Sequence, residues 1–113
     1  MKSLLSLKID GNIVLEFDRN TRLPGQQRDF LDKMDEDMSQ GIRLSEKYIP
    51  EPDDLQRGYY VAIHLLQAFE EGDQSMITAT CAYLVQRLPG LNTIQVDHDS
   101  QGVNLKLKLE NSR

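Results

Sequence analysis

Two segments of alternating apolar and polar residues, one near each end, most constrain what this chain can fold into. In the first, residues 4–17, apolar side chains recur at every second position on both sides of Asp10-Gly11-Asn12: Leu5, Leu7, Ile9, Ile13, Leu15 and Phe17. A period of two is typical of strands with one buried face. The segment therefore predicts a β-hairpin that opens the domain.

The register of this hairpin depends on the length of its loop. A two-residue loop at Asp10-Gly11 would pair Leu7 with Val14, which places apolar residues on both faces. A three-residue loop instead pairs Ile9 with Ile13, Leu7 with Leu15 and Leu5 with Phe17, and so keeps one face apolar. The pattern favours this second register, with Asn12 in the left-handed conformation near the end of the loop.

The second alternating segment predicts a hairpin at the C-terminal end. Its apolar positions are Ile94, Val96, Val103, Leu105, Leu107 and Leu109. If Val96 pairs with Val103, Ile94 lies opposite Leu105 and the two apolar faces agree. The polar residues 97–102 then form the loop.

The middle of the chain has the spacing of helices. Apolar residues that recur every three or four positions predict a first helix with Phe30, Leu31, Met34 and Met38 on one side, ending near Gly41. Residues 41–50 are expected to be a connector, and Pro52 to lie in the first turn of a helix that spans Leu55–Phe69. Gly72 ends that helix, and Asp73 caps the next, Gln74–Leu88.

These elements predict a single α+β domain over residues 1–113, in the order ββαααββ. We expect an antiparallel sheet covered on one face by three helices, with Leu55–Phe69 and Met76–Leu88 against the sheet. Hydrophobic residues make up 39% of the chain, which is typical of a globular domain. The expected dry face of the sheet comprises Leu5, Leu7, Ile9, Ile13, Leu15, Phe17, Ile94, Val96, Leu105 and Leu107. The strand order stays open, as does an arrangement of two separate ribbons.

Charge excludes several classes of partner. The net charge is −5, and residues 28–54, with nine acidic and four basic side chains, carry a net −5 by themselves. Nucleic acids and anionic membranes both require a basic surface, so neither is an expected partner.

The compartment is predicted from other features. The first residues show no export signal, and no segment is long and apolar enough for a membrane span. The single cysteine, Cys81, has no partner for a disulfide within the chain. We therefore expect a cytoplasmic protein.

No motif in the sequence predicts catalysis, a cofactor or a metal, so we expect no catalytic, cofactor-binding or metal-ligating residues. His64 lies in an apolar run and is interpreted as a hydrogen-bonded structural residue; the alternative is a base in a pocket. Asp97-His98-Asp99 could hold a cation, but the residue types equally suit a solvated hairpin loop, which we favour. Cys81, between apolar neighbours, is expected to be a small core residue.

The acidic helix is the one candidate site. Asp32, Asp35 and Glu36 follow at helical spacing and are therefore expected on one face. A cation such as calcium requires about six to eight oxygen ligands, usually from a wrapping loop that this helix lacks. We interpret the three residues as a docking face for a basic protein partner, not as a metal site.

Self-association completes the predictions from sequence. The segment from Met76 to Val85 carries no charge, and Val61–Phe69 is mostly apolar. A chain of this size has few elements to cover both helices, so we expect a homodimer with the helix around Cys81, or its neighbour, at the interface. The expected function is that of a non-enzymatic accessory or regulatory protein acting through protein–protein contact. The alternative is a small enzyme or ligand-binding protein with a pocket between helices and sheet near His64.

Overall fold

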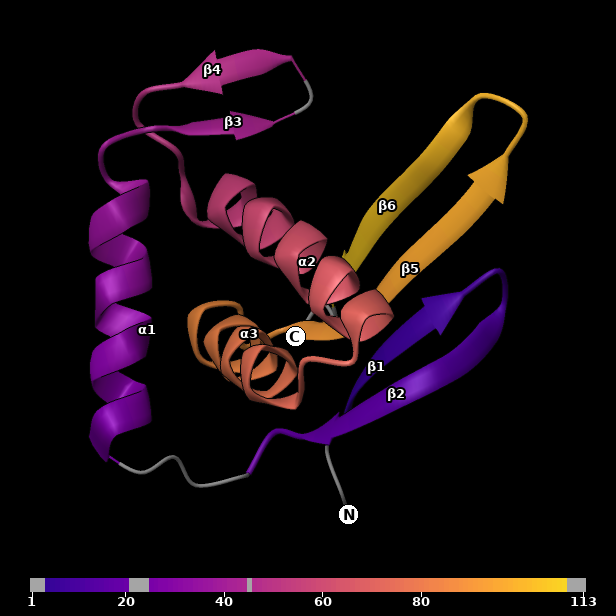
Figure 1. Cartoon of the computed structure of the whole chain (residues 1–113), viewed down its shortest axis with the longest axis horizontal. Helices are drawn as coiled ribbons and strands as arrows, with labels where there is room; N and C mark the ends of the chain where they lie inside the picture. The colour runs from indigo at the N-terminus through magenta and orange to yellow at the C-terminus, as the bar shows by residue number, and fades with distance from the viewer. Residues whose placement is uncertain (1–3, 21–24, 45, 110–113) are drawn as a thin grey trace.

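The order of elements follows the apolar patterns of the sequence (Figure 1). The computed structural model describes residues 4–20, 25–44 and 46–109. Its elements are β1 (Leu4–Ile9), β2 (Asn12–Asp18), α1 (Gly25–Met38), β3 (Ile42–Leu44), β4 (Lys47–Ile49), α2 (Asp54–Glu71), α3 (Gln74–Arg87), β5 (Leu91–Asp99) and β6 (Gly102–Leu109). The α+β class and the order of two hairpins around three helices are confirmed. A further short hairpin, β3–β4, lies in the stretch that we expected to be a connector.

The two long hairpins form one four-stranded sheet in the order β2-β1-β5-β6. Pairing is antiparallel within each hairpin, as expected, whereas β1 and β5 pair in parallel at the centre. The sheet is therefore mixed, and the alternative of two separate ribbons does not occur. The edge strands carry charged side chains, among them Glu16 on β2 and Lys106 on β6, which is how natural sheets limit pairing at their edges.

The first hairpin turns more tightly than the sequence predicts. Asp10 and Gly11 form a two-residue turn in which both have positive φ, 52° and 87°. This is the geometry of a type I′ turn, for which Asp-Gly is well suited. A bulge between Leu7 and Lys8 then restores the expected pairs of Leu7 with Leu15 and of Leu5 with Phe17.

The expected pairing at the tip of this hairpin is wrong. Ile9 pairs with Asn12, and Lys8 with Ile13, so the three-residue loop and the left-handed Asn12 do not occur. Ile13 is consequently 52% exposed and does not belong to the dry face. The remaining residues of the expected dry face are all buried or packed against the core.

The second hairpin has the expected faces in a different register. Val96 pairs with Leu105 and Ile94 with Leu107, a shift of two residues that leaves every side chain on its expected side. Strand β5 continues through Asp97-His98-Asp99, and Asp99 pairs with Gly102. The expected loop over residues 97–102 is therefore wrong, because a shorter turn lets more residues pair.

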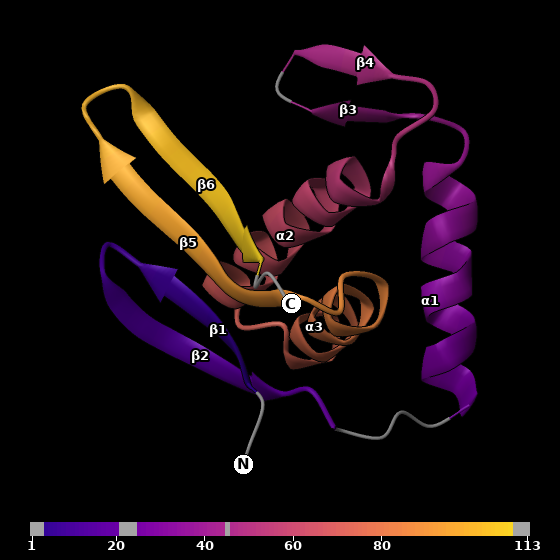
Figure 2. The same cartoon turned by 180° about the vertical axis from the view of Figure 1, so that it is seen from behind.

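Helices α2 and α3 lie against one face of the sheet, and α1 lies on their outer side (Figures 1 and 2). All three helices thus lie on one side of the sheet, with α2 and α3 against it as expected and α1 packed on α3. The main core lies between the sheet and the two inner helices, and includes Leu5, Leu7, Val61, Leu65, Cys81, Leu84, Ile94 and Val96. None of the helices in the described ranges is long and apolar enough to cross a membrane.

Local side chains define where the inner helices begin and end. Asp53 caps α2 in a reciprocal capping box with Gln56, so Pro52 precedes the cap and is not in the first turn as expected. Gly72 ends α2 in the left-handed conformation, and Asp73 caps α3, both as expected.

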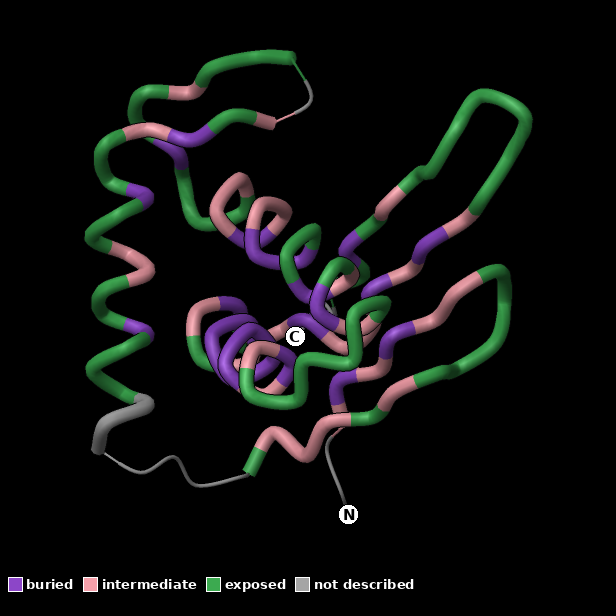
Figure 3. Tube along the Cα trace, in the orientation of Figure 1, coloured by how far each residue is buried: buried purple, intermediate pink, exposed green. Residues whose placement is uncertain are grey.

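Helix α3 is covered on nearly all sides within the single chain, as the buried turns in Figure 3 show. Residues 79–84 are all buried, and Cys81 is 1% exposed. Because α1 covers the side of α3 that faces away from the sheet, the chain itself supplies what we expected from a second subunit. Burial of Cys81 therefore favours the neighbouring helix α2 as the dimer surface, and the expected homodimer, with either helix at its interface, stays a prediction.

The β3–β4 hairpin links α1 to α2. Tyr48 on β4 lies against Gly41 and its hydroxyl donates to the carbonyl of Gln40 at 2.8 Å. Gly41 has φ of 109°, and a Cβ there would overlap the Tyr48 ring, so glycine is required for both reasons. Strands of three residues are too short to produce a recognisable period, which is why the sequence did not predict this hairpin.

Candidate functional site

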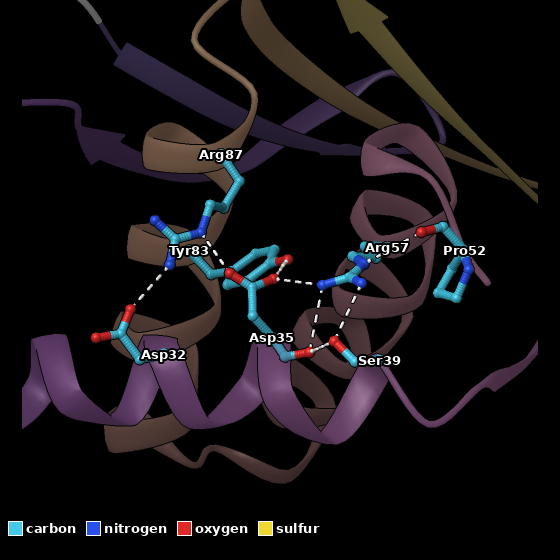
Figure 4. A network of polar contacts seen from close by, with 7 residues as sticks. All are labelled: Asp32, Asp35, Ser39, Pro52, Arg57, Tyr83 and Arg87. Carbon is cyan, nitrogen blue, oxygen red and sulfur yellow. Dashed lines mark hydrogen bonds and ion pairs between the residues drawn. The ribbon is translucent and has the colours of Figure 1, made fainter. Parts of the chain in front are cut away.

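Asp35 points inward from α1 to the two inner helices (Figure 4). Its Oδ1 accepts hydrogen bonds from Arg57 Nη1 at 3.1 Å and from the Tyr83 hydroxyl, and its Oδ2 accepts from Arg87 Nε at 2.7 Å. The side chain is 27% exposed. One carboxylate of α1 therefore joins α2, which carries Arg57, to α3, which carries Tyr83 and Arg87.

The two arginines extend this network to the ends of α1 and α2. Arg57 donates to the carbonyl of Asp35 at 3.2 Å, to Ser39 Oγ at 3.3 Å and to the carbonyl of Pro52 at 3.3 Å. Arg87 Nη2 donates to Asp32 Oδ1 at 3.2 Å. Since each guanidinium contacts at least two groups, the network sets the position of α1 more precisely than a single ion pair would.

The network shifts the ionisation of its members. Partial burial acts to raise the pKa of Asp35, but hydrogen bonds from Tyr83, Arg87 and Arg57 outweigh it, so the pKa lies below its ordinary value of 3.8. Burial and the adjacent Asp35 carboxylate both raise the pKa of Tyr83, which therefore remains a donor. A carboxylate occupied by three donors is not available as a base or nucleophile, so this cluster holds the helices together.

The expected docking face is consequently divided. Asp32 and Glu36 are exposed, whereas Asp35 faces the helices behind it. Successive residues lie about 100° apart around a helix, so Asp35 and Glu36 can point to different sides. Four exposed acids and Lys33 form a shallow hollow of about 340 Å³ on the outer side of α1, which we call the acidic face: Asp29, Asp32, Lys33, Glu36 and Asp37. Whether this face binds a partner stays a prediction.

An apolar pocket of about 200 Å³ lies beside the acidic face, between α1, α2 and α3. We call it the methionine pocket, because three of the four methionines of the chain line it. Its lining residues are Phe30, Met34, Asp37, Met38, Tyr60, Val61, His64, Met76 and Thr80. Asp37 belongs to both surfaces, so the apolar pocket and the acidic face meet at this residue.

His64 lies at the methionine pocket and is exposed. Its ring meets the edge of Tyr60 at a centroid distance of 4.7 Å. The interpretation of His64 as a buried structural residue is therefore wrong, because it projects from the outer side of α2. The pocket expected near His64 exists, but it lies between three helices and not between helices and sheet.

A second groove, of about 590 Å³, runs along the other exposed side of α2. Strands β3 and β6 form its walls, and it is lined by Leu44, Tyr59, Ile63, Leu66, Gln67, Glu70, Val103, Asn104 and Leu105. Ile63 and Val103 are 37% and 53% exposed. We call this the α2 groove. It is a second surface on which α2, the neighbour of the Cys81 helix, is uncovered.

The Asp97-His98-Asp99 triplet is spread over the faces of β5. Asp97 accepts from Gln95, Asp99 accepts from Asn104, and His98 contacts Asp10 at 2.9 Å. Backbone and side-chain hydrogen bonds from His98 lower the pKa of Asp10. In the described ranges, no three His, Cys, Asp or Glu residues lie close enough together to hold a metal ion.

Cys81 is a core residue, as the sequence predicts. Its burial raises the pKa of the thiol to about 12, so the reactive thiolate is not formed near neutral pH. This cysteine therefore contributes packing and no accessible chemistry.

Sequence reasoning missed the partners of Asp35. Arg57, Tyr83 and Arg87 lie 22, 48 and 52 residues from it. A single sequence carries no signal for ion pairs at such separations. The available signal is spacing: Asp35 lies four residues after Leu31 and three before Met38, so it shares the side of the helix that carries these apolar residues.

Comparison with protein-family models, with curated proteins and with solved structures gives no match to this chain.

Proposed function

We propose that this chain is a non-enzymatic, cytoplasmic accessory or regulatory protein that binds a basic protein partner through the acidic face of α1. One observation carries the proposal. The arginines of α2 and α3 that reach α1, Arg57 and Arg87, are engaged by Asp35 and Asp32. In the described parts of the chain no ion pair involves Asp29, Glu36 or Asp37. These carboxylates are displayed on a helix that the Asp35 network holds in place, which suits recognition of an opposite charge.

The nature of the partner follows from the same charges. Like-charge repulsion disfavours nucleic acids and anionic lipid surfaces, because both present phosphates to a chain of net charge −5. A basic protein surface makes no demand on ligand number or geometry, unlike a metal ion. Complementary charge would mainly speed encounter and determine orientation, so the complex is expected to be sensitive to salt.

Reversing two charges of the acidic face tests this proposal. We expect the wild-type chain to capture from native lysate a partner that binds through a Lys- or Arg-rich segment. The Glu36→Lys/Asp37→Lys variant is expected to lose this partner. Capture should also weaken between low and physiological salt, where screening shortens to about 8 Å. The matched control is Glu51→Lys/Glu71→Lys, the same number of charge reversals at two exposed acids outside the acidic face and the α2 groove. A partner that persists with the first variant and at physiological salt would refute the acidic face as the docking surface.

Self-association remains part of the proposal, now at the α2 groove. A closed two-fold dimer would cover Ile63 and Val103, which the single chain leaves exposed. Light scattering at tens of micromolar is expected to give twice the monomer mass of 13.0 kDa, and the monomer mass in an Ile63→Glu variant. A wild-type chain of 13.0 kDa under these conditions would rule out the dimer.

A small enzyme or ligand-binding protein is the second candidate function, and the methionine pocket beside His64 is the observation that favours it. Turnover or ligand binding that disappears in a folded His64→Ala variant would favour this candidate over the first. His64 is exposed, so this substitution is expected to leave the stability of the domain nearly unchanged.

A further inference from the structure

The methionine pocket is an apolar surface of a particular composition. Met34 and Met76 are half-buried at its sides, Met38 is buried beneath, and Phe30 is 38% exposed. Methionine is unbranched and polarisable, so a surface that contains several of them adapts to different apolar side chains. Such surfaces are typical of proteins that receive an anchor residue from a partner.

The size of the pocket sets the size of that anchor. A cavity of about 150 Å³ is sufficient to hold benzene, so a pocket of about 200 Å³ holds one aromatic ring or one long aliphatic side chain. A larger apolar group would not fit inside the pocket and would remain on the protein surface. The pocket is therefore suited to one side chain of a peptide.

The charge beside the pocket identifies what surrounds the anchor. Asp37 lines the pocket and belongs to the acidic face, which continues along α1 through Glu36, Asp32 and Asp29. Helix α1 has 14 residues and is therefore about 21 Å long. A segment that places one large apolar side chain in the pocket would have its neighbouring residues against these carboxylates, where Lys and Arg are favoured.

We propose that the methionine pocket receives a single aromatic or long aliphatic side chain from a basic amphipathic helix of the partner, while the Lys and Arg residues of that helix contact the acidic face. This inference rests on the proposed function and adds the chemistry of the partner segment. Helix-in-groove recognition inserts apolar side chains from one face of a helix; here the pocket has room for one such side chain, and the adjoining acidic face can meet basic residues beside it.

The chain contains no tryptophan, which allows a direct test. The probe is a short synthetic peptide of Ala and Lys with one Trp, in which Lys lies three and four residues on either side of Trp. Trp emission then reports only the peptide, and we expect it to shift to shorter wavelength on binding because the indole enters the pocket. The same peptide with Ala in place of Trp serves as a competitor, and we expect its affinity to be about tenfold to hundredfold lower than that of the Trp peptide.

Pocket and charge variants separate the two contributions. We expect the Met34→Gln/Met76→Gln variant, which is neutral and similar in shape, to lower the affinity about tenfold and to abolish the emission shift. The matched control is Leu55→Gln, a substitution by the same residue at an exposed apolar position of α2 outside both the pocket and the α2 groove. Far-UV circular dichroism and thermal melting check that all variants are folded.

The outcomes distinguish this inference from the proposed function. The peptide could bind in a way that depends on Glu36 and Asp37, yet show no emission shift and no effect of Met34→Gln/Met76→Gln. That result would overturn the pocket inference and leave the docking function. No binding of the peptide at low salt would overturn both. Equally tight binding of tryptamine and the peptide would show that the pocket takes a small ligand, and would also overturn the inference.

Discussion

The Leu7→Asp variant is expected not to fold. Leu7 is 2% exposed and pairs with Leu15 on β2 and with Ile94 on β5, at the centre of the sheet. The substitution removes about 1.5–3 kcal/mol of apolar burial and adds a buried, unpaired carboxylate that costs several more. This sum is comparable to the whole stability of a typical domain, about 5–15 kcal/mol. Circular dichroism and thermal melting of the purified variant measure the result.

Ile13→Asp is the matched control for Leu7→Asp, because both residues belong to the alternating pattern of the first hairpin. The bulge leaves Ile13 52% exposed, so this variant is expected to fold and to lose only about 1 kcal/mol of strand preference. Leu7→Ala provides a measurable transition, with an expected loss of about 2–5 kcal/mol. An Ile13→Asp chain as unstable as Leu7→Asp, or a Leu7→Asp chain that melts like the wild type, would show that the register is wrong.

The second large effect is expected for Asp35→Ala. This change leaves Arg57, Arg87 and the Tyr83 hydroxyl without their shared acceptor. Removing one member of a buried charge network costs about 3–5 kcal/mol, and the partial exposure of Asp35 reduces this to about 2–3 kcal/mol. Chemical denaturation measures the loss in unfolding free energy. In the Asp35→Ala variant, amide hydrogen exchange should also accelerate relative to the wild type, more in α1 than in the sheet, because α1 is the helix that the network holds.

Asp32→Ala is the matched control for Asp35→Ala, one turn earlier on α1. The Asp32 side chain is 77% exposed and makes one ion pair, with Arg87, so we expect a loss of less than about 1 kcal/mol. Equal losses for the two substitutions, or a stability of Asp35→Ala within error of the wild type, would contradict the role given to the network.

Asp35 also predicts how stability depends on pH. Its pKa in the folded chain lies below the ordinary value of 3.8, so the folded state favours the ionised form. The contribution of Asp35 is therefore complete above about pH 4 and is lost as the pH falls through the lowered pKa. Denaturation curves of wild type and Asp35→Ala should converge on acidification. A difference between them that persists unchanged below this range would exclude ionisation of Asp35 as its source.

Local patterns were sufficient to predict several parts of this protein. Alternation over residues 4–17 and 94–109 predicted both long hairpins, because burial of one face requires a period of two. Gly72 and Asp73 predicted where α2 ends and α3 begins, because left-handed backbone and capping are properties of single residues. Each of these signals lies within a few residues of the structure that it specifies.

Register and the parallel central pair depended on interactions beyond the hairpins. The bulge between Leu7 and Lys8 lets the Asp10-Gly11 turn and the apolar face coexist, and a count of positions alone does not reveal it. Pairing of β1 with β5 brings together strands separated by the whole helical middle of the chain. The sequence indicated which faces are apolar, and contacts between distant segments selected how those faces meet.

The candidate site shows the same division. Composition and spacing alone determined that α1 is acidic and amphipathic, since these are properties of consecutive residues. Only the tertiary structure decided that Asp35 faces Arg57, Tyr83 and Arg87, and that three methionines from α1 and α3 line one pocket with His64 of α2. The physical reason is that a helix has a face only relative to its neighbours. Which carboxylate is paired and which is displayed depends on where α2 and α3 lie against α1.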